Sequence, residues 1–159
     1  MSIIKLSQHF TLDEATSSQT ASRLGIYNTP SDAVIAVMKS TATNMETVRD
    51  ILNSKPITVS SWYRSPELNV KIGGVKTSQH CKGEAVDFIC PMYGSCYYVA
   101  NAIMHSKIDF DQLILEHTWV HISFKSDPYA NQRRQVLSLL KSGGYANGLT
   151  DVNGHPYTM

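Results

Sequence analysis

Two histidines and one aspartate are the side chains of this sequence whose types and spacing could bind a metal ion. His80 and Asp87 lie seven positions apart, and His121 follows in a second apolar stretch. Two imidazoles and one carboxylate are a ligand set of catalytic zinc sites, in which water fills the fourth position. The spacing of His80 and Asp87 is weak evidence by itself, because most such pairs lie in surface loops or make structural hydrogen bonds. The prediction of a zinc site therefore depends on whether the fold brings the three side chains together.

The alternation of side chains along two expected strands supports such a meeting. In EAVDFI, apolar side chains form one face and Asp87 lies on the other; in WVHISF, His121 takes the corresponding place. If both strands belong to one sheet, Asp87 and His121 share a cleft with His80, which precedes the first strand. Gly83 allows the loop that carries His80 to turn back.

Capping signals and hydrophobic periodicity predict the helices that come first in the chain. Thr11 and Glu14 have the spacing of a capping box, which predicts a short helix. Pro30 and Ser31 open a longer segment in which core-type side chains recur at alternating steps of four and three. This segment predicts a helix that ends near Asn53.

Beyond Pro56 the pattern changes to short extended runs, which predict strands. The runs are ITVSSWY, EAVDFI, DQLILE, WVHISF and RRQVLSLL, at residues 57–63, 84–89, 111–116, 119–124 and 133–140. A short helix capped by Ser65 is expected after the first run, and another helix, in SCYYVANAIMHS, after the second. This order predicts an α+β fold in which an antiparallel sheet has helices packed on one side and the N-terminal helices precede the strands.

Length and composition are those of one ordinary globular domain, expected to span residues 1–159. The chain is 42% hydrophobic and 17% charged, with a formal net charge of +1. These values argue against nucleic-acid binding, and no apolar run has the length of a membrane span or of a signal peptide. We therefore expect a protein that is cytoplasmic on synthesis and does not insert into membranes. Cys81, Cys90 and Cys96 are expected to be free thiols, a Cys90–Cys96 bridge being the less favoured alternative.

Ordered motifs along the chain resemble those of a known enzyme family. The motifs are Phe10-Thr11, Ser61-Trp62-Tyr63-Arg64-Ser65-Pro66-Glu67-Leu68-Asn69, Gly73-Gly74-Val75-Lys76-Thr77-Ser78, Ser78-x-His80-x-x-Gly83-x-Ala85-x-Asp87, Asp111-Gln112-Leu113-Ile114 and Trp119-Val120-His121. They resemble the zinc D-Ala-D-Ala carboxypeptidase family of peptidoglycan peptidases, which has a hedgehog-type fold, and in particular its branch in phages and prophages, which includes endolysins. The similarity covers roughly residues 8 to 125.

This resemblance implies roles for five residues. His80, Asp87 and His121 would be the zinc ligands. This agrees with the alternation of side chains along the two expected strands, which places Asp87 and His121 on corresponding faces. Arg64 and Ser78 would bind substrate, and Arg64 would hold a substrate carbonyl or carboxylate and stabilise the oxyanion. From the residues alone, Arg64 could instead form a structural salt bridge, and Ser78 could simply cap its loop.

The general base is expected at Glu116, although its spacing departs from a common form of the family. In many relatives an acid stands three residues before the final histidine, where this chain has Thr118, whose hydroxyl cannot serve as the base. LILE and WVHIS are expected to pair as a hairpin that places Glu116 opposite Trp119 and near His121. The alternative is that Glu116 only closes its strand in solvent and that His117 is the base.

The resemblance and the predicted site together imply a zinc-dependent metallopeptidase that hydrolyses a peptide bond of the bacterial peptidoglycan stem peptide. It would act as a D-Ala-D-Ala carboxypeptidase or as an L-Ala-D-Glu-type endopeptidase. The alternative is a non-catalytic zinc-containing module for cell-wall binding or for a phage structure. A phage-encoded enzyme without a signal peptide would act on the wall after release through a holin, or as a virion component.

Overall fold

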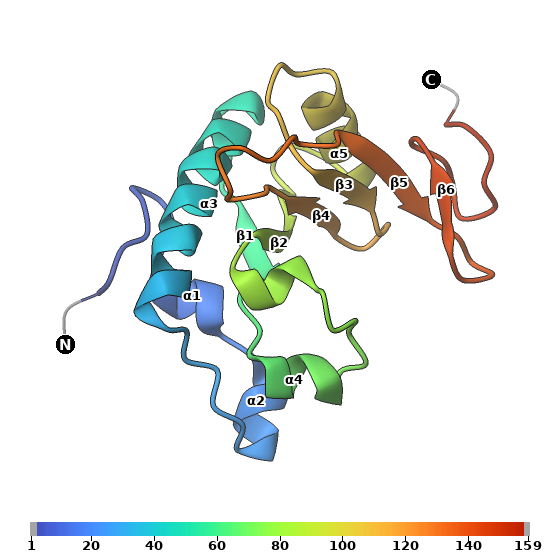
Figure 1. Ribbon diagram of the computed structural model, residues 1–159. Coiled ribbons are helices and arrows are strands. Elements are labelled where there is room, and N and C mark those ends of the chain that lie inside the picture. The colour runs from blue at the N-terminus through green and yellow to red at the C-terminus, as the bar shows by residue number, and fades with distance from the viewer. Residues whose placement is uncertain (1–2, 158–159) are drawn as a thin grey trace.

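A computed structural model describes residues 3–157 and has the predicted α+β architecture, with helices α1 to α3 preceding the strands (Figure 1). The helices are α1 (Leu12–Thr16), α2 (Gln19–Leu24), α3 (Asp32–Ile51), α4 (Pro66–Lys71) and α5 (Cys96–Met104), and a 3-10 turn spans Gln79–Lys82. The strands are β1 (Thr58–Ser61), β2 (Ala85–Ile89), β3 (Gln112–Leu115), β4 (Val120–Ser123), β5 (Gln135–Leu139) and β6 (Tyr145–Asn147). The expected domain of residues 1–159 includes residues 1–2 and 158–159, which lie outside the described residues.

All six strands belong to one sheet with the order β1-β2-β4-β3-β5-β6. Neighbouring strands are antiparallel, except that β3 and β5 are parallel. A parallel pair needs a crossover connection rather than a tight turn, and here the chain from β4 returns along the sheet before β5 begins. The sheet is thus antiparallel around β2 and β4, as expected, and departs from that pattern only toward the C-terminus.

The core lies between one face of the sheet and the helices α3 and α5 (Figure 1). It includes Met38, Ala42, Met45 and Val48 of α3, Val99, Ala100 and Ile103 of α5, and Val86, Phe88, Leu113, Val120 and Ile122 of the strands. The predicted apolar faces of β2 and β4 are therefore confirmed as the buried ones. Their other face carries the polar side chains and is open to the candidate site.

Two short elements were not predicted, α2 and β6. Ser18 caps the start of α2 and Gly25 ends it in the left-handed conformation, but Ala21 is the only residue of the helix that is buried. Strand β6 has three residues, none of them buried. Neither element has the apolar periodicity on which a prediction from sequence depends.

The structure also bears on the predictions about the cysteines and about membrane insertion. Cys81, Cys90 and Cys96 are free thiols, as predicted. Among residues 3–157, none of the helices combines the length and the apolarity that crossing a membrane requires.

Candidate metal centre

Strands β2 and β4 bring Asp87 and His121 together. The two residues are direct partners in the antiparallel register. Nδ1 of His121 lies 2.9 Å from Oδ1 of Asp87, and the two side chains are only 14% and 15% exposed. The prediction that alternation along the two strands places these side chains on one face is confirmed.

His80 meets this pair from the 3-10 turn before β2. Its Nε2 lies 3.3 Å from Oδ2 of Asp87, and its Nδ1 lies 2.6 Å from the carbonyl oxygen of Trp62. Because a carbonyl oxygen can only accept a hydrogen bond, Nδ1 carries the proton. In the neutral ring Nε2 then has a lone pair, which faces a carboxylate oxygen of Asp87. A cation between the imidazole and the carboxylate would stabilise this arrangement. The same orienting bond to a backbone carbonyl is usual for histidines that bind metals.

Gly83 ends the turn that carries His80. Its φ angle is 77°, which residues with a side chain rarely adopt, and a Cβ at this position would lie 2.6 Å from Cγ of Met38. Its carbonyl oxygen also accepts hydrogen bonds from Nε1 of Trp62 at 3.0 Å and Oγ1 of Thr41 at 2.9 Å. The turn is therefore fixed against α3 and the segment after β1, as the expected role of Gly83 requires.

His80, Asp87 and His121 have the arrangement of a site for one cation. Each offers one ligand atom, and these atoms lie within 4.8 Å of one another. Burial raises the pKa of the Asp87 carboxyl, but its contacts with the His121 and His80 rings outweigh burial and lower it. Asp87 is therefore ionised at neutral pH. Two imidazoles and one carboxylate fit zinc and leave a position for water.

A cleft of about 610 Å³ opens above the three side chains, and Arg64, Ser78 and Glu116 also line it. The structure thus brings all of the predicted site residues together. Oγ of Ser78 accepts a hydrogen bond of 3.2 Å from the backbone N–H of His80 and caps the 3-10 turn. Ser78 therefore caps its loop and lines the cleft, so the two roles considered for it are compatible.

Arg64 lies in the wall of the cleft directly after the buried Trp62 and Tyr63. Its Nε is buried and has no hydrogen-bond partner among residues 3–157, and its guanidinium forms no ion pair with them. Burial lowers the pKa of the Arg64 guanidinium, while the negative charge of Asp87 raises it. The described residues give no support to a structural salt bridge. A buried donor without a partner is unusual and points to a ligand as its acceptor.

Glu116 and His117 lie in the hairpin between β3 and β4, but in different surroundings. The backbone N–H of Glu116 donates to the carbonyl oxygen of Trp119 at 3.1 Å, so the predicted pairing is confirmed. Burial raises the pKa of the Glu116 carboxyl; the charge of His121 opposes this, and the charge of Asp87 adds to it. A carboxyl whose pKa is raised toward neutrality is suited to proton transfer.

His117 is directed to a separate pocket. Its φ angle is 68°, its Nε2 lies 2.9 Å from the carbonyl oxygen of Leu139, and it lines that pocket together with Tyr97 and Tyr157. Of the two candidate bases, only Glu116 lines the cleft.

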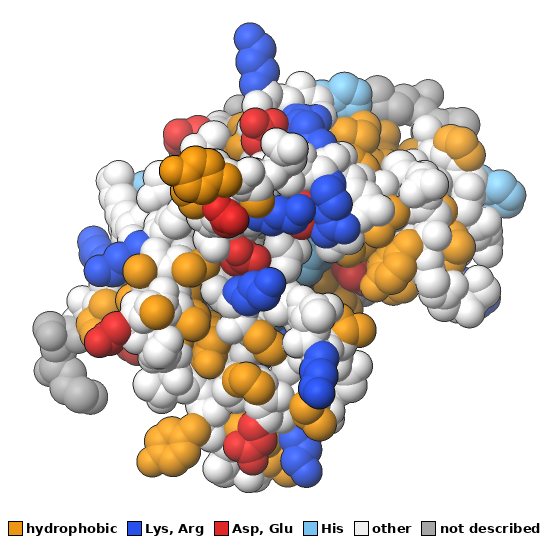
Figure 2. Space-filling model, in the orientation of Figure 1, with side chains coloured by type: hydrophobic (Ala, Val, Ile, Leu, Met, Phe, Trp, Pro, Cys, Tyr) orange, Lys and Arg blue, Asp and Glu red, His pale blue; other side chains and the backbone are white. Residues whose placement is uncertain are grey.

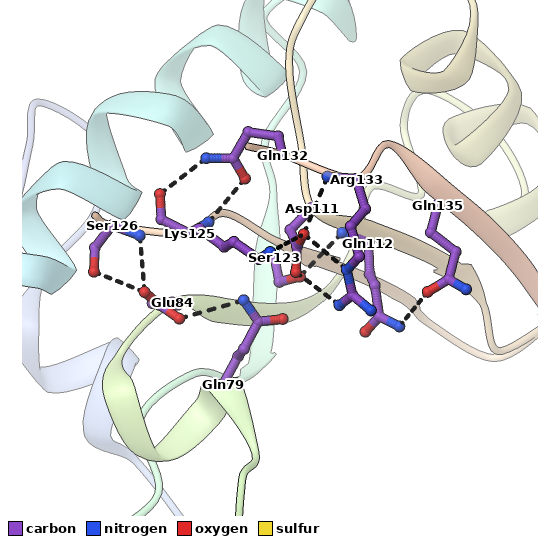
Figure 3. A network of polar contacts seen from close by, with 10 residues as sticks. All are labelled: Gln79, Glu84, Asp111, Gln112, Ser123, Lys125, Ser126, Gln132, Arg133 and Gln135. Atoms are coloured by element: carbon purple, nitrogen blue, oxygen red, sulfur yellow. Dashed lines mark hydrogen bonds and ion pairs between the residues drawn. The ribbon is translucent and has the colours of Figure 1, made fainter. Parts of the chain in front are cut away.

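The cleft has further polar side chains for which the sequence predicted no role. They are Thr77, Gln79, Lys82, Glu84, Asp111, Gln112, Lys125, Arg133 and Tyr145. Many of them belong to one network of hydrogen bonds and ion pairs (Figure 3). Asp111 and Gln112 lie in the DQLI motif, but Lys125, Arg133 and Tyr145 come from the C-terminal segment, which the motifs do not cover.

One family model matches the chain. The family is described as Peptidase M15, and the match covers residues 8–123, which include every predicted site residue. No curated protein matches the chain.

Proposed function

The chain belongs to the Peptidase M15 family, and we propose that it is a zinc-dependent peptidase that hydrolyses a peptide bond of the bacterial peptidoglycan stem peptide. His80, Asp87 and His121 are the proposed zinc ligands. The observation that carries this proposal is the close approach of their three ligand atoms at the floor of the cleft.

Zinc fits these residues better than the harder divalent ions do. Two of the three donors are imidazole nitrogens, which suit zinc, whereas magnesium and calcium prefer oxygen ligands. When bound, zinc supplies a Lewis acid that makes water more acidic and polarises a carbonyl group. The carbonyl oxygen of Trp62 holds the His80 ring in the orientation in which Nε2 faces Asp87. Trp62 is therefore a positioning residue.

Glu116 and Arg64 are the proposed catalytic residues. Glu116 takes a proton from the attacking water and gives it to the nitrogen of the departing amine as the peptide bond breaks. Arg64 donates hydrogen bonds to a substrate carbonyl or carboxylate and stabilises the negative charge that develops on the oxygen. Ser78, at the rim of the same cleft, contacts the substrate. Removal of water by the bound substrate strengthens each of these interactions.

The bond that is cut is either the terminal D-Ala–D-Ala bond or the L-Ala–D-Glu bond. We further propose a phage or prophage setting, with release through a holin or carriage on a virion. The second candidate function is a non-catalytic zinc-containing wall-binding module. The position of Glu116 in the cleft favours the enzyme, since a binding module needs no base there.

Mass spectrometry of purified stem peptides after incubation with the zinc-loaded protein tests the proposed function. We expect one peptide bond to be cleaved, cleavage to stop when a chelator removes the zinc, and cleavage to return when zinc is restored. Intact peptides after incubation with fully zinc-loaded protein would overturn the enzyme and favour the binding module.

A further inference from the structure

One end of the cleft is cationic, and no step of the proposed hydrolysis uses it. Arg133 and Lys125 converge there on Asp111 (Figure 3). Nε and Nη2 of Arg133 lie 3.0 and 2.8 Å from the two carboxylate oxygens of Asp111, and Nζ of Lys125 lies 3.6 Å from Oδ1. Asp111 is fully buried, whereas the side chains of Arg133 and Lys125 are 48% and 35% exposed. The carboxylate thus fixes two cations at the wall of the cleft.

Asp111, Arg133 and Lys125 together have a net charge of +1. One carboxylate, Asp111, faces two cations. The nearby carboxylate of Glu84 is directed away from these cations and accepts hydrogen bonds from the backbone N–H and the hydroxyl of Ser126, at 2.8 and 2.7 Å, and from Gln79. Lys82 also lines the cleft. Figure 2 shows Lys and Arg side chains gathered among acidic ones on the face over β4 and β3.

Arg133 has free donors as well as charge. A guanidinium has five N–H groups, and the pairing with Asp111 uses the edge formed by Nε and Nη2. Nη1 makes no hydrogen bond to any other residue between positions 3 and 157. The forked geometry of a guanidinium fits a second carboxylate on its free edge. An anchored arginine of this kind is therefore a ready site for a carboxylate of the substrate.

The register of the sheet gives the separation between this cluster and the metal ligands. Ser123 lies two residues beyond His121 on β4, and its carbonyl oxygen accepts a hydrogen bond of 2.7 Å from the backbone N–H of Asp111. Two residues of a strand span about 7 Å. Asp111 directly precedes β3 and so lies roughly one residue farther from His121 than Ser123 does. An extended peptide covers the same distance in about two to three residues. A substrate group that the cluster binds therefore belongs to a residue about two to three positions from the bond that is cut.

We propose that Arg133 and Lys125 form a subsite for a second carboxylate of the substrate. The proposal rests on the proposed function and specifies its substrate class. The third residue of a stem peptide is commonly diaminopimelate, whose side chain ends in a carboxylate beside its ammonium, or lysine, which ends in an ammonium alone. The subsite attracts the carboxylate of the first and repels the uncompensated cation of the second. Diaminopimelate-type peptides are therefore the preferred substrates.

This preference belongs to the C-terminal segment of the chain. The family match ends at residue 123. Lys125 and Arg133 lie beyond it, in the segment that leads from β4 to β5. Specificity for the third residue is thus separate from the zinc ligands and from Glu116, which lie within the family match.

The test is the ratio of kcat/KM values for two stem peptides that differ only in having diaminopimelate or lysine as the third residue. We expect wild type to prefer the diaminopimelate peptide by about tenfold, the effect of one charge-assisted contact in a half-exposed site. The double variant R133Q/D111N removes the cation together with its buried partner, so that no buried charge is left alone. Its ratio should fall to within about twofold of unity, and that of K125Q should fall part of the way.

The matched control is K141Q, which removes one positive charge from an exposed lysine outside the cleft and should keep the wild-type ratio. Equal kcat/KM values for the two peptides in wild type, or an unchanged ratio in both cleft variants, would overturn the subsite. If R133Q/D111N does not fold, the ratio for K125Q decides.

Failure of the proposed function has a different signature, which is that zinc-loaded wild type cleaves neither peptide. The subsite is then tested by calorimetric titration of the same two peptides. Tighter binding of the diaminopimelate peptide that is lost in the cleft variants would support it, and equal binding would overturn it.

Discussion

Replacing Glu116 with Gln removes the proposed general base and changes little else. The amide has nearly the same shape as the carboxylate, and the hairpin contact at this position uses the backbone N–H of Glu116 and the carbonyl oxygen of Trp119, which the substitution retains. Glu116 is not among the three side chains that could hold the metal. The variant should therefore fold, keep its zinc and lack only the group that accepts a proton.

The expected loss follows from the role of a positioned base. General acid–base catalysis contributes about 10²–10⁴-fold to the rate, so kcat for stem-peptide hydrolysis should fall by that factor in E116Q. Because burial raises the pKa of Glu116 above its ordinary value of 4.5, the base loses its proton only at a higher pH than an exposed carboxyl does. The kcat/KM of wild type should therefore decline on the acid side at a pH above 4.5, and this limb should be absent from the residual activity of E116Q.

The assay measures initial rates of peptide release by chromatography. The zinc content of each sample is determined in parallel. His117→Ala is the matched control. Its side chain contacts the carbonyl oxygen of Leu139 and lies in a different pocket, so H117A should keep its rate within roughly threefold of wild type. Near wild-type turnover by E116Q together with an inactive H117A would refute the assignment and give the role to His117.

Three further substitutions test other parts of the site. Gly83→Ala should lower Tm by roughly 5–15 °C, because a left-handed alanine is strained and its Cβ would lie 2.6 Å from Cγ of Met38; an unchanged Tm in scanning calorimetry would contradict this. Arg64→Lys should reduce kcat/KM roughly 10–100-fold with no loss of zinc, because an ammonium lacks the forked donors, and full activity would exclude the oxyanion role. The lowered pKa of Asp87 stabilises the metal-free protein above pH 4, and this contribution is lost as the pH falls further. Urea unfolding should thus show the largest difference between wild type and Asp87→Asn above pH 4, and a difference that grows toward lower pH would contradict this prediction.

The strand faces on which Asp87 and His121 lie could be predicted because alternation along a strand is a local pattern, whereas the pairing of β2 with β4 was only a condition of the prediction. Alternation fixed the face of each side chain, and a short hairpin brought β4 beside β3. The position of Glu116 opposite Trp119 follows from the same hairpin. These features require only periodicity and a tight turn, both of which can be read along the sequence.

The cationic end of the cleft could not be predicted, because it depends on a contact between distant segments. Arg133 meets Asp111 only after the chain leaves β4 and returns to place β5 parallel to β3. Residues 133–140 predicted a strand but not its neighbour. Nothing in the local pattern around Asp111 indicated a buried carboxylate, since the partners that stabilise it lie far along the chain.

The most direct test of the central claim is the zinc content of the purified protein and its ligand variants, measured by elemental analysis in metal-free buffer. We expect about one zinc per chain for wild type and for E116Q, and a large loss of zinc for His80→Ala, Asp87→Ala and His121→Ala. Equal zinc content in wild type and in the three ligand variants would contradict it, since the metal would then lie elsewhere.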